Sequence, residues 1–121
     1  MRFYSAARVV DDIELLHRKY GCQFIVVADD LATVNKKRMT EIRDLLKIKG
    51  LSGHLEFSVQ ARANVFDEQL CEILKGINVT DVAFGIESGS QRILEYLKGN
   101  TVTIEQNRRA IQLALSHGFR V

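Results

Sequence analysis

The sequence predicts an α/β fold in which consecutive βα units are arranged around a parallel sheet. Short apolar runs of strand length alternate with longer segments whose apolar residues recur at helical spacing. A glycine or an N-capping residue marks most boundaries between these segments. The resulting order is helix, strand, helix, strand, helix, strand, helix, helix, strand, and no linker or low-complexity segment interrupts it.

The composition is that of one soluble globular domain. The chain has 121 residues, of which 46% are hydrophobic and 26% are charged, so it can bury a single core. No apolar run approaches the roughly 20 residues of a membrane span, and we expect a cytoplasmic protein without a membrane partner. The net charge of +2 is too small to indicate nucleic-acid binding.

The first part of the chain predicts two helices around one strand. Apolar residues at helical spacing predict a helix over Ala6–Tyr20, which Gly21 ends. The continuous apolar run Phe24–Ala28 predicts a strand that is covered on both faces. Asn35 can cap the next helix, and Gly50 follows it as a stop.

The strand predicted over Leu55–Arg62 alternates between apolar and polar side chains. Because strands alternate with helices, the apolar side chains should pack under helices, and these are Leu55, Phe57 and Val59. The polar side chains should face a concave surface, and these are Glu56, Ser58 and Gln60. Asp67 then caps a short helix that Gly76 should end.

The most informative strand is Asp81–Glu87, which runs into a Gly/Ser turn. Its one face carries Val82, Phe84 and Ile86, and the other carries Ala83, Gly85 and Glu87. A face without bulky side chains that ends in a carboxylate indicates space for a ligand, and Gly85 and Gly89 would allow a close approach.

The last part of the chain predicts two helices and the start of a strand. Ser90 can cap a helix that carries Ile93, Leu94 and Leu97 and ends at Gly99. Thr103-x-x-Gln106 is a capping box that opens a helix, which ends at Gly118. Phe119–Val121 then begins a further strand.

Ionisable residues stand at three successive strand ends. Asp29 and Asp30 follow one strand, Arg62 the next and Glu87 the third. The carboxyl ends of parallel strands meet at one edge of a sheet, so these residues should converge, and we favour a functional site there. The alternative is that Glu87 is a solvated loop acid and that the glycines serve turn geometry alone.

A metal site is not predicted. Cys22 and Cys71 are too few and too far apart in sequence to form a metal or cluster motif. Cys71 stands among apolar residues of a predicted helix, where a buried thiol packs as a small hydrophobe.

The stretch Gly85–Ser90 and the residues after it closely resemble the radical S-adenosylmethionine (radical SAM) superfamily. The resembling residues are Gly-Ile-Glu-Ser-Gly-Ser, then Ile93-Leu94-x-x-Leu97-Lys98, then Thr103-x-Glu105-Gln106 with Ala110-Ile111, and finally Gly118. More narrowly, they resemble the group whose members often carry a cobalamin-binding domain, together with methylthiotransferases. The Asp29-Asp30 turn resembles the turn after the second barrel strand of that family, and Arg62 resembles a residue of the third strand.

The resemblance implies a partial, half TIM-type barrel over residues 1–121 and a parent enzyme that makes a 5'-deoxyadenosyl radical. The implied cofactors are S-adenosylmethionine and a 4Fe-4S cluster, with cobalamin left open. It places Asp29 and Asp30 near the methionine amino group, Glu87 near the ribose or methionine portion, and Arg62 toward a carboxylate or the substrate. Ser88 and Gly89 belong to the same cofactor-binding turn.

The chain departs from the family in one respect. The cluster motif Cys-x-x-x-Cys-x-x-Cys is absent, and the resemblance places the chain just after that motif, with the later strands also missing. We therefore expect a barrel segment that is inactive alone and that self-associates into a homo-oligomer through its open strand edges.

Two other classes of function remain open at this point. The chain could be a non-catalytic α/β module that binds a small anion or a partner protein at its strand ends, or a half-barrel that functions by completing another chain. Binding of S-adenosylmethionine separates the first class from an enzyme, and the genomic sequence upstream of Met1 separates the second.

Overall fold

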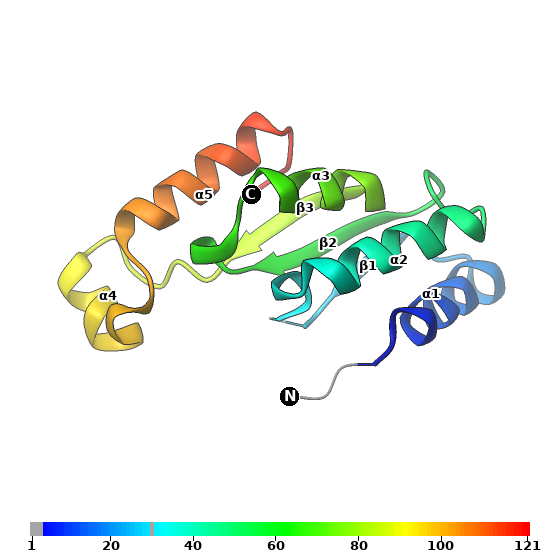
Figure 1. The fold of residues 1–121 in the computed structure, drawn as a ribbon, viewed down its shortest axis with the longest axis horizontal. Coiled ribbons are helices and arrows are strands. Elements are labelled where there is room, and N and C mark those ends of the chain that lie inside the picture. The colour runs from blue at the N-terminus through cyan, green and yellow to red at the C-terminus, as the bar shows by residue number, and fades with distance from the viewer. Residues whose placement is uncertain (1–3, 30) are drawn as a thin grey trace.

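The computed structural model describes residues 4–29 and 31–121 and confirms the predicted order of elements (Figure 1). Its helices and strands are α1 (Ala6–Tyr20), β1 (Phe24–Val27), α2 (Lys36–Ile48), β2 (Glu56–Ala61), α3 (Glu68–Ile77), β3 (Val79–Phe84), α4 (Gln91–Lys98) and α5 (Ile104–Ser116). Short 3₁₀ turns lie between them, namely η1 (Ala32–Val34), η2 (Ala63–Val65) and η3 (Gly99–Thr101).

The strands form a parallel sheet in the order β1-β2-β3, which confirms the predicted α/β class. Val26 pairs with Ser58, and Ser58 pairs with Asp81, so these side chains share one face of the sheet. Arg120 forms a further parallel bridge with Asp81, which confirms that a strand begins near the end of the chain.

Helices cover one face of this sheet. The apolar side chains of β2 are buried as predicted, with Phe57 3% and Val59 2% exposed, whereas Glu56 and Gln60 are exposed on the opposite face. The core beneath the helices includes Leu46, Leu70, Leu74 and Val82. In Figure 1, α2 and α3 run alongside the strands, α1 lies next to α2, and α4 lies at the opposite end from α1.

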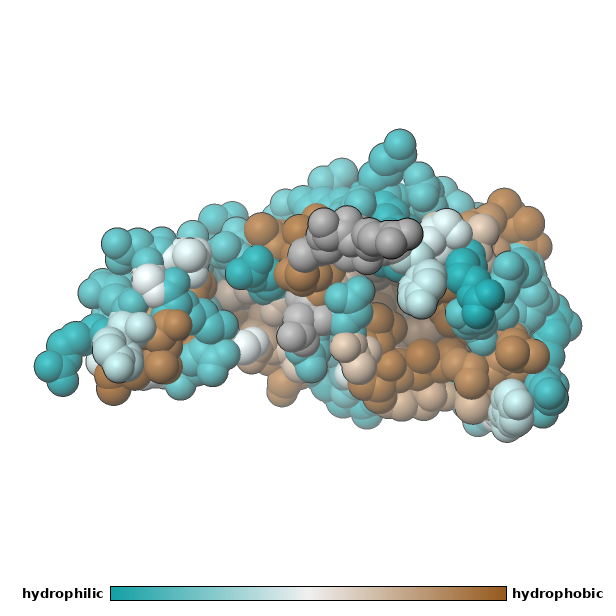
Figure 2. Space-filling view, turned by 90° about the horizontal axis from the view of Figure 1, so that it is seen from below, coloured by the Kyte–Doolittle hydropathy of each residue, from teal (hydrophilic) through white to brown (hydrophobic). Residues whose placement is uncertain are grey.

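The prediction that the first strand is covered on both faces is wrong. Phe24 and Val26 are 47% and 64% exposed, because they share the open face of the sheet with Ser58 and Gln60. Figure 2 shows apolar surface gathered toward the end of the molecule that carries α1. Exposed apolar residues of α1 and β1 are Leu15, Leu16, Tyr20, Phe24 and Val26.

Gly76 does not end its helix, contrary to the prediction. The helix α3 continues to Ile77, and Asn78 takes the left-handed C-cap position at φ 73°. Gly76 has another role, since a Cβ atom there would lie 2.5 Å from Cδ of Arg43 on α2. The missing side chain lets the Arg43 stem cross α3 closely.

The helix α4 begins and ends where predicted, but its apolar stripe is mostly not buried. Leu94 is fully buried, whereas Ile93 and Leu97 are 45% and 55% exposed. Ser90 occupies the N-cap position, yet its side chain makes no capping hydrogen bond. By contrast, the predicted Thr103/Gln106 capping box at the start of α5 forms in full.

None of the helices in the described ranges is long and apolar enough to cross a membrane.

Candidate functional site at the carboxyl ends of the strands

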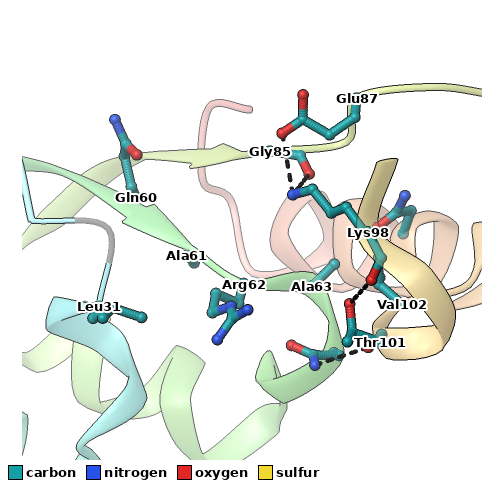
Figure 3. Close-up of a pocket in the computed structure, with 12 residues that line it drawn as sticks. Leu31, Gln60, Ala61, Arg62, Ala63, Gly85, Glu87, Lys98, Thr101 and Val102 are labelled. Atoms are coloured by element: carbon teal, nitrogen blue, oxygen red, sulfur yellow. Dashed lines mark hydrogen bonds and ion pairs between the residues drawn. The ribbon is translucent and has the colours of Figure 1, made fainter. Parts of the chain in front are cut away.

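A cleft of about 500 Å³ lies where β2 and β3 end, between them and the segment from α4 to α5 (Figure 3). Its polar lining residues are Gln60, Arg62, Asn64, Glu87, Lys98, Thr101 and Asn107. Carboxyl ends of parallel strands are where α/β proteins place their ligand sites. Arg62 and Lys98 bring two cations to the cleft, and Glu87 brings one carboxylate.

Glu87 lies in a tight turn just after β3. The strand ends at Phe84, earlier than the predicted Glu87, although the alternation continues, with Gly85 and Glu87 exposed. Glu87 has a φ of 62°, and the Ser88 N–H donates to the Ile86 carbonyl at 2.7 Å across it. A three-residue turn with this sign of φ is strained and costs on the order of 1–3 kcal/mol in a non-glycine residue.

The turn directs the Glu87 carboxylate back over Gly85. A Cβ atom on Gly85 would lie 3.2 Å from Oε1 of Glu87 and 3.4 Å from Nζ of Lys98. In the structure, the space predicted beside Gly85 is therefore occupied by the side-chain ends of Glu87 and Lys98, which form an ion pair. A side chain at position 85 would crowd the Glu87 carboxylate and touch the Lys98 ammonium group.

Lys98 reaches from the last turn of α4 to the end of β3. Its Nζ donates to the Gly85 carbonyl at 3.1 Å and lies 3.1 Å from Oε1 of Glu87 (Figure 3). The side chains of Lys98 and Glu87 are 34% and 45% exposed, so the pair is accessible to a ligand and partly screened by water.

A chain of hydrogen bonds joins the two strand ends across the cleft. Asn64 in η2 donates through Nδ2 to the Thr101 carbonyl at 3.2 Å, and the Thr101 hydroxyl donates to the Lys98 carbonyl at 2.8 Å. Lys98 then contacts the β3 end through Gly85, as Figure 3 shows. These contacts tie the segment after β2 to the turn that carries Glu87.

The structure brings some of the predicted site residues together and leaves others apart. Arg62 and Glu87 line the same cleft, but the Arg62 side chain leaves its strand end on the side of Leu31, away from Glu87 and Lys98 (Figure 3). Asp29 does not line the cleft, because its Oδ1 accepts a hydrogen bond from the Leu31 N–H at 3.0 Å within its own loop.

The remaining predicted residues lie in or near the turn. The Ser88 hydroxyl oxygen accepts a hydrogen bond from the Ser90 N–H at 3.0 Å, so it shapes the turn rather than the cleft lining. A Cβ atom on Gly89 would meet nothing within 4 Å, so this position is open. Asp30 lies outside the described residues.

Asn107 is a cleft residue that the sequence prediction missed. It is 3% exposed in the first turns of α5, and its Nδ2 donates to the Ile86 carbonyl at 3.5 Å. Its Oδ1 is buried and has no hydrogen-bond partner among the described residues. The sequence carried a signal for it, since Asn107 is a polar residue in register with the buried Ala110 and Ala114.

Lys98 was also missed as a site residue. From the sequence it is a lysine in the last turn of a helix, which the helix dipole alone explains. Its contact with Glu87 joins the end of α4 to the turn after β3, and no local pattern encodes that.

The described residues do not provide ligands for an iron-sulfur cluster. No group of three or more His, Cys, Asp or Glu residues that could hold a metal ion occurs in residues 4–29 and 31–121. Burial raises the pKa of the Cys71 thiol to about 11, with the nearby acids Glu68 and Asp67 contributing, so it is not a ready thiolate ligand. Cys22 is a free cysteine far from it in sequence.

Known proteins resemble this chain over nearly its full length. The family model described as the radical SAM superfamily matches residues 1–121. An uncharacterized methyltransferase of Pyrococcus horikoshii is 36% identical over 118 residues, which cover 98% of this chain and 25% of that protein. An anaerobic magnesium-protoporphyrin IX monomethyl ester cyclase of Rubrivivax gelatinosus is 30% identical over 98% of this chain and 21% of its own length.

A solved structure shares the fold. The radical S-adenosylmethionine methyltransferase TsrM of Kitasatospora setae, with cobalamin and a 4Fe-4S cluster bound, superposes with a TM-score of 0.79 at 20% identity. The match covers 95% of this chain and 24% of TsrM, so the chain spans about a quarter of the length of these proteins. The resemblance found in the sequence is thereby confirmed, and the chain belongs to the radical SAM superfamily.

Proposed function

We propose that this chain is a central segment of a radical SAM barrel and that its strand-end cleft supplies part of the binding site for S-adenosylmethionine or for the substrate beside it. The observation that carries the proposal is that Glu87, Arg62 and Lys98 all line one cleft at the carboxyl ends of parallel strands. The family match over residues 1–121 and the quarter-length coverage of relatives support it.

The side chains of the cleft suit the polar groups of S-adenosylmethionine. A carboxylate such as Glu87 accepts hydrogen bonds from ribose hydroxyls or from an ammonium group. A guanidinium such as that of Arg62 binds a carboxylate through two parallel N–H groups. The open sheet face beside the cleft carries Gln60 and Ser58, which offer further polar contacts to a substrate.

The cluster belongs, in this proposal, to residues outside this segment. A 4Fe-4S cluster supplies the electron that cleaves S-adenosylmethionine in this superfamily, and it needs thiolates at close spacing. Cys22 and Cys71 do not meet that need. We propose that the 121-residue chain is inactive alone and that a cobalamin-dependent reaction, as the bound cobalamin of TsrM suggests, would likewise depend on other parts of a longer protein.

Anaerobic reconstitution tests this proposal. The 121-residue chain and the longest open reading frame that contains it are each incubated with iron and sulfide, then with S-adenosylmethionine and a reductant. We expect a stoichiometric cluster and 5'-deoxyadenosine by chromatography from the longer protein only. A cluster on the 121-residue chain would contradict its inactivity, and a longer protein without a cluster would overturn the enzyme assignment.

A binding experiment separates the enzyme segment from an anion-binding module. The ¹⁵N-labelled chain is titrated with S-adenosylmethionine and, separately, with inorganic phosphate. We expect S-adenosylmethionine to shift the amide signals of residues 85–89 and 98, and phosphate to shift them less at equal concentration. Equal responses to both would favour the anion-binding module.

A further inference from the structure

The turn that carries Glu87 is held by contacts from outside itself. Its backbone is strained at φ 62°, and the short hydrogen bond from Ser88 to Ile86 spans a single residue. Isolated turns of this kind open easily because extended backbone is the more stable alternative. The turn therefore needs support from elsewhere in the fold to stay closed.

Lys98 supplies that support at two points. One ammonium group contacts both the Gly85 carbonyl and Oε1 of Glu87, each at 3.1 Å, so it fixes the backbone before the turn and the side chain within it. A charge-assisted hydrogen bond is stronger than a neutral one. No hydrogen bond to Oε2 of Glu87 forms among the described residues, which leaves that oxygen for a ligand donor.

Lys98 is itself fixed by its neighbours. The Thr101 hydroxyl donates to the Lys98 carbonyl at 2.8 Å, and Asn64 holds the Thr101 carbonyl from the β2 side. Gly99 ends α4 at φ 60°, so the chain turns sharply just after Lys98. The backbone from which the lysine side chain extends is thus held in place.

Asn107 braces the same turn from α5. Its Nδ2 approaches the Ile86 carbonyl, the same oxygen that accepts from Ser88. Its Oδ1 is buried without a partner among the described residues, which is unfavourable, so the amide is retained at a cost to stability. Polar side chains from α4 and α5 therefore reach the adjacent carbonyls of Gly85 and Ile86.

We propose that Lys98 is a positioning residue for Glu87. It holds the strained turn so that the Glu87 carboxylate stays over Gly85 with one oxygen free, ready to accept hydrogen bonds from a hydroxyl or ammonium group of the ligand. The inference rests on the proposed function for its ligand, but the positioning itself is measurable without one.

The test uses the ¹⁵N-labelled 121-residue chain and four variants. Lys98→Met removes the ammonium group, Lys98→Arg keeps a cation, and Glu87→Gln weakens the pair from the other side. Lys47→Met is the matched control, because Lys47 is an exposed lysine near the end of α2. The first readout is hydrogen exchange of the Ser88 amide, and the second is the dissociation constant for S-adenosylmethionine from amide shifts.

We expect Lys98→Met to speed exchange of the Ser88 amide roughly tenfold and to weaken binding by roughly three- to tenfold. Glu87→Gln should speed exchange less, Lys98→Arg should recover most of both properties, and Lys47→Met should change neither. If Lys98→Met unfolds the chain, Ser88 exchange in Glu87→Gln and Lys98→Arg still tests the positioning role of Lys98.

The outcomes separate the inference from the proposed function. Unchanged Ser88 exchange in both Lys98→Met and Glu87→Gln would overturn the positioning role, whatever the binding result. Faster exchange in Lys98→Met together with no response of the wild-type chain to S-adenosylmethionine would support the positioning role and count against the proposed ligand.

Discussion

Arg120 holds the carboxylate of Asp81 with two N–H groups, Nε to Oδ1 and Nη2 to Oδ2, each at 2.8 Å. The backbone of Arg120 also bonds to Thr80 and Val82, so side chain and main chain together attach the last strand segment to β3. This bidentate pair fixes the relative orientation of the two side chains more specifically than a single contact between the same charges.

The Asp81–Arg120 pair predicts a pH dependence of stability. The Arg120 guanidinium, with a smaller contribution from the Thr80 hydroxyl, lowers the pKa of Asp81 below its ordinary value of 3.8. A carboxyl whose pKa is lower in the folded state than in the unfolded chain stabilises the fold at pH values above the unfolded-state pKa. This stabilisation is lost as the pH falls through the folded-state pKa. The urea midpoint should therefore fall on acidification below about pH 4.

Asp81→Asn should lower the urea midpoint at neutral pH and flatten its decline in acid. Asp44→Asn is the control, because Asp44 is exposed on α2 and pairs with its neighbour Arg43. An acid decline in Asp81→Asn as steep as in the wild-type chain would show that the pair does not contribute to it.

Gly76 and Arg43 should be energetically coupled. Alanine in place of a glycine inside a helix normally stabilises it by about 1 kcal/mol. A Cβ atom at Gly76 would overlap the Arg43 stem at 2.5 Å, so Gly76→Ala should gain little or destabilise the chain. In an Arg43→Ala background, the same change should stabilise by about 0.5–1 kcal/mol. Urea unfolding of the four proteins measures the coupling, and equal effects in both backgrounds would disprove it.

The capping box at the start of α5 should contribute more to the free energy of unfolding than the N-cap residue of α4. The Thr103 hydroxyl accepts a hydrogen bond from the Gln106 N–H at 3.1 Å, whereas Ser90 makes no side-chain cap. Thr103→Ala should cost about 1 kcal/mol of unfolding free energy, and Thr103→Ser should recover most of it. Ser90→Ala is the matched control and should change stability little. A Ser90→Ala cost equal to that of Thr103→Ala would contradict this ranking.

Self-association through the edge of the sheet is a further prediction. β1 lies at one edge of the described sheet and exposes Phe24 and Val26 on its open face. An exposed apolar edge strand promotes pairing with a second copy. Light scattering should show a dimer or larger species, and Val26→Lys should shift it toward monomer. Ile48→Lys is the control and should leave the association unchanged, because Ile48 is a 79% exposed apolar residue on α2. A monodisperse wild-type monomer at high concentration would contradict the prediction.

The sequence by itself determined the order of the elements, the caps at Asn35, Asp67 and Thr103, and the buried face of β2. These features depend on local spacing and on hydrogen bonds between residues close in sequence. The sequence also located Arg62 and Glu87 at neighbouring strand ends, because parallel strands place their carboxyl ends at one edge of the sheet.

The tertiary structure alone decided that one face of β1 stays open and which charges meet. Val26 belongs to an apolar run that predicts burial, yet the helices pack on the other face of its sheet. Gly76 leaves room for the Arg43 side chain and does not end its helix. Lys98 meets Glu87 because the end of α4 lies beside the turn after β3, while Asp29 is turned into its own loop. Each outcome depends on contacts between residues distant in sequence, which local patterns do not encode.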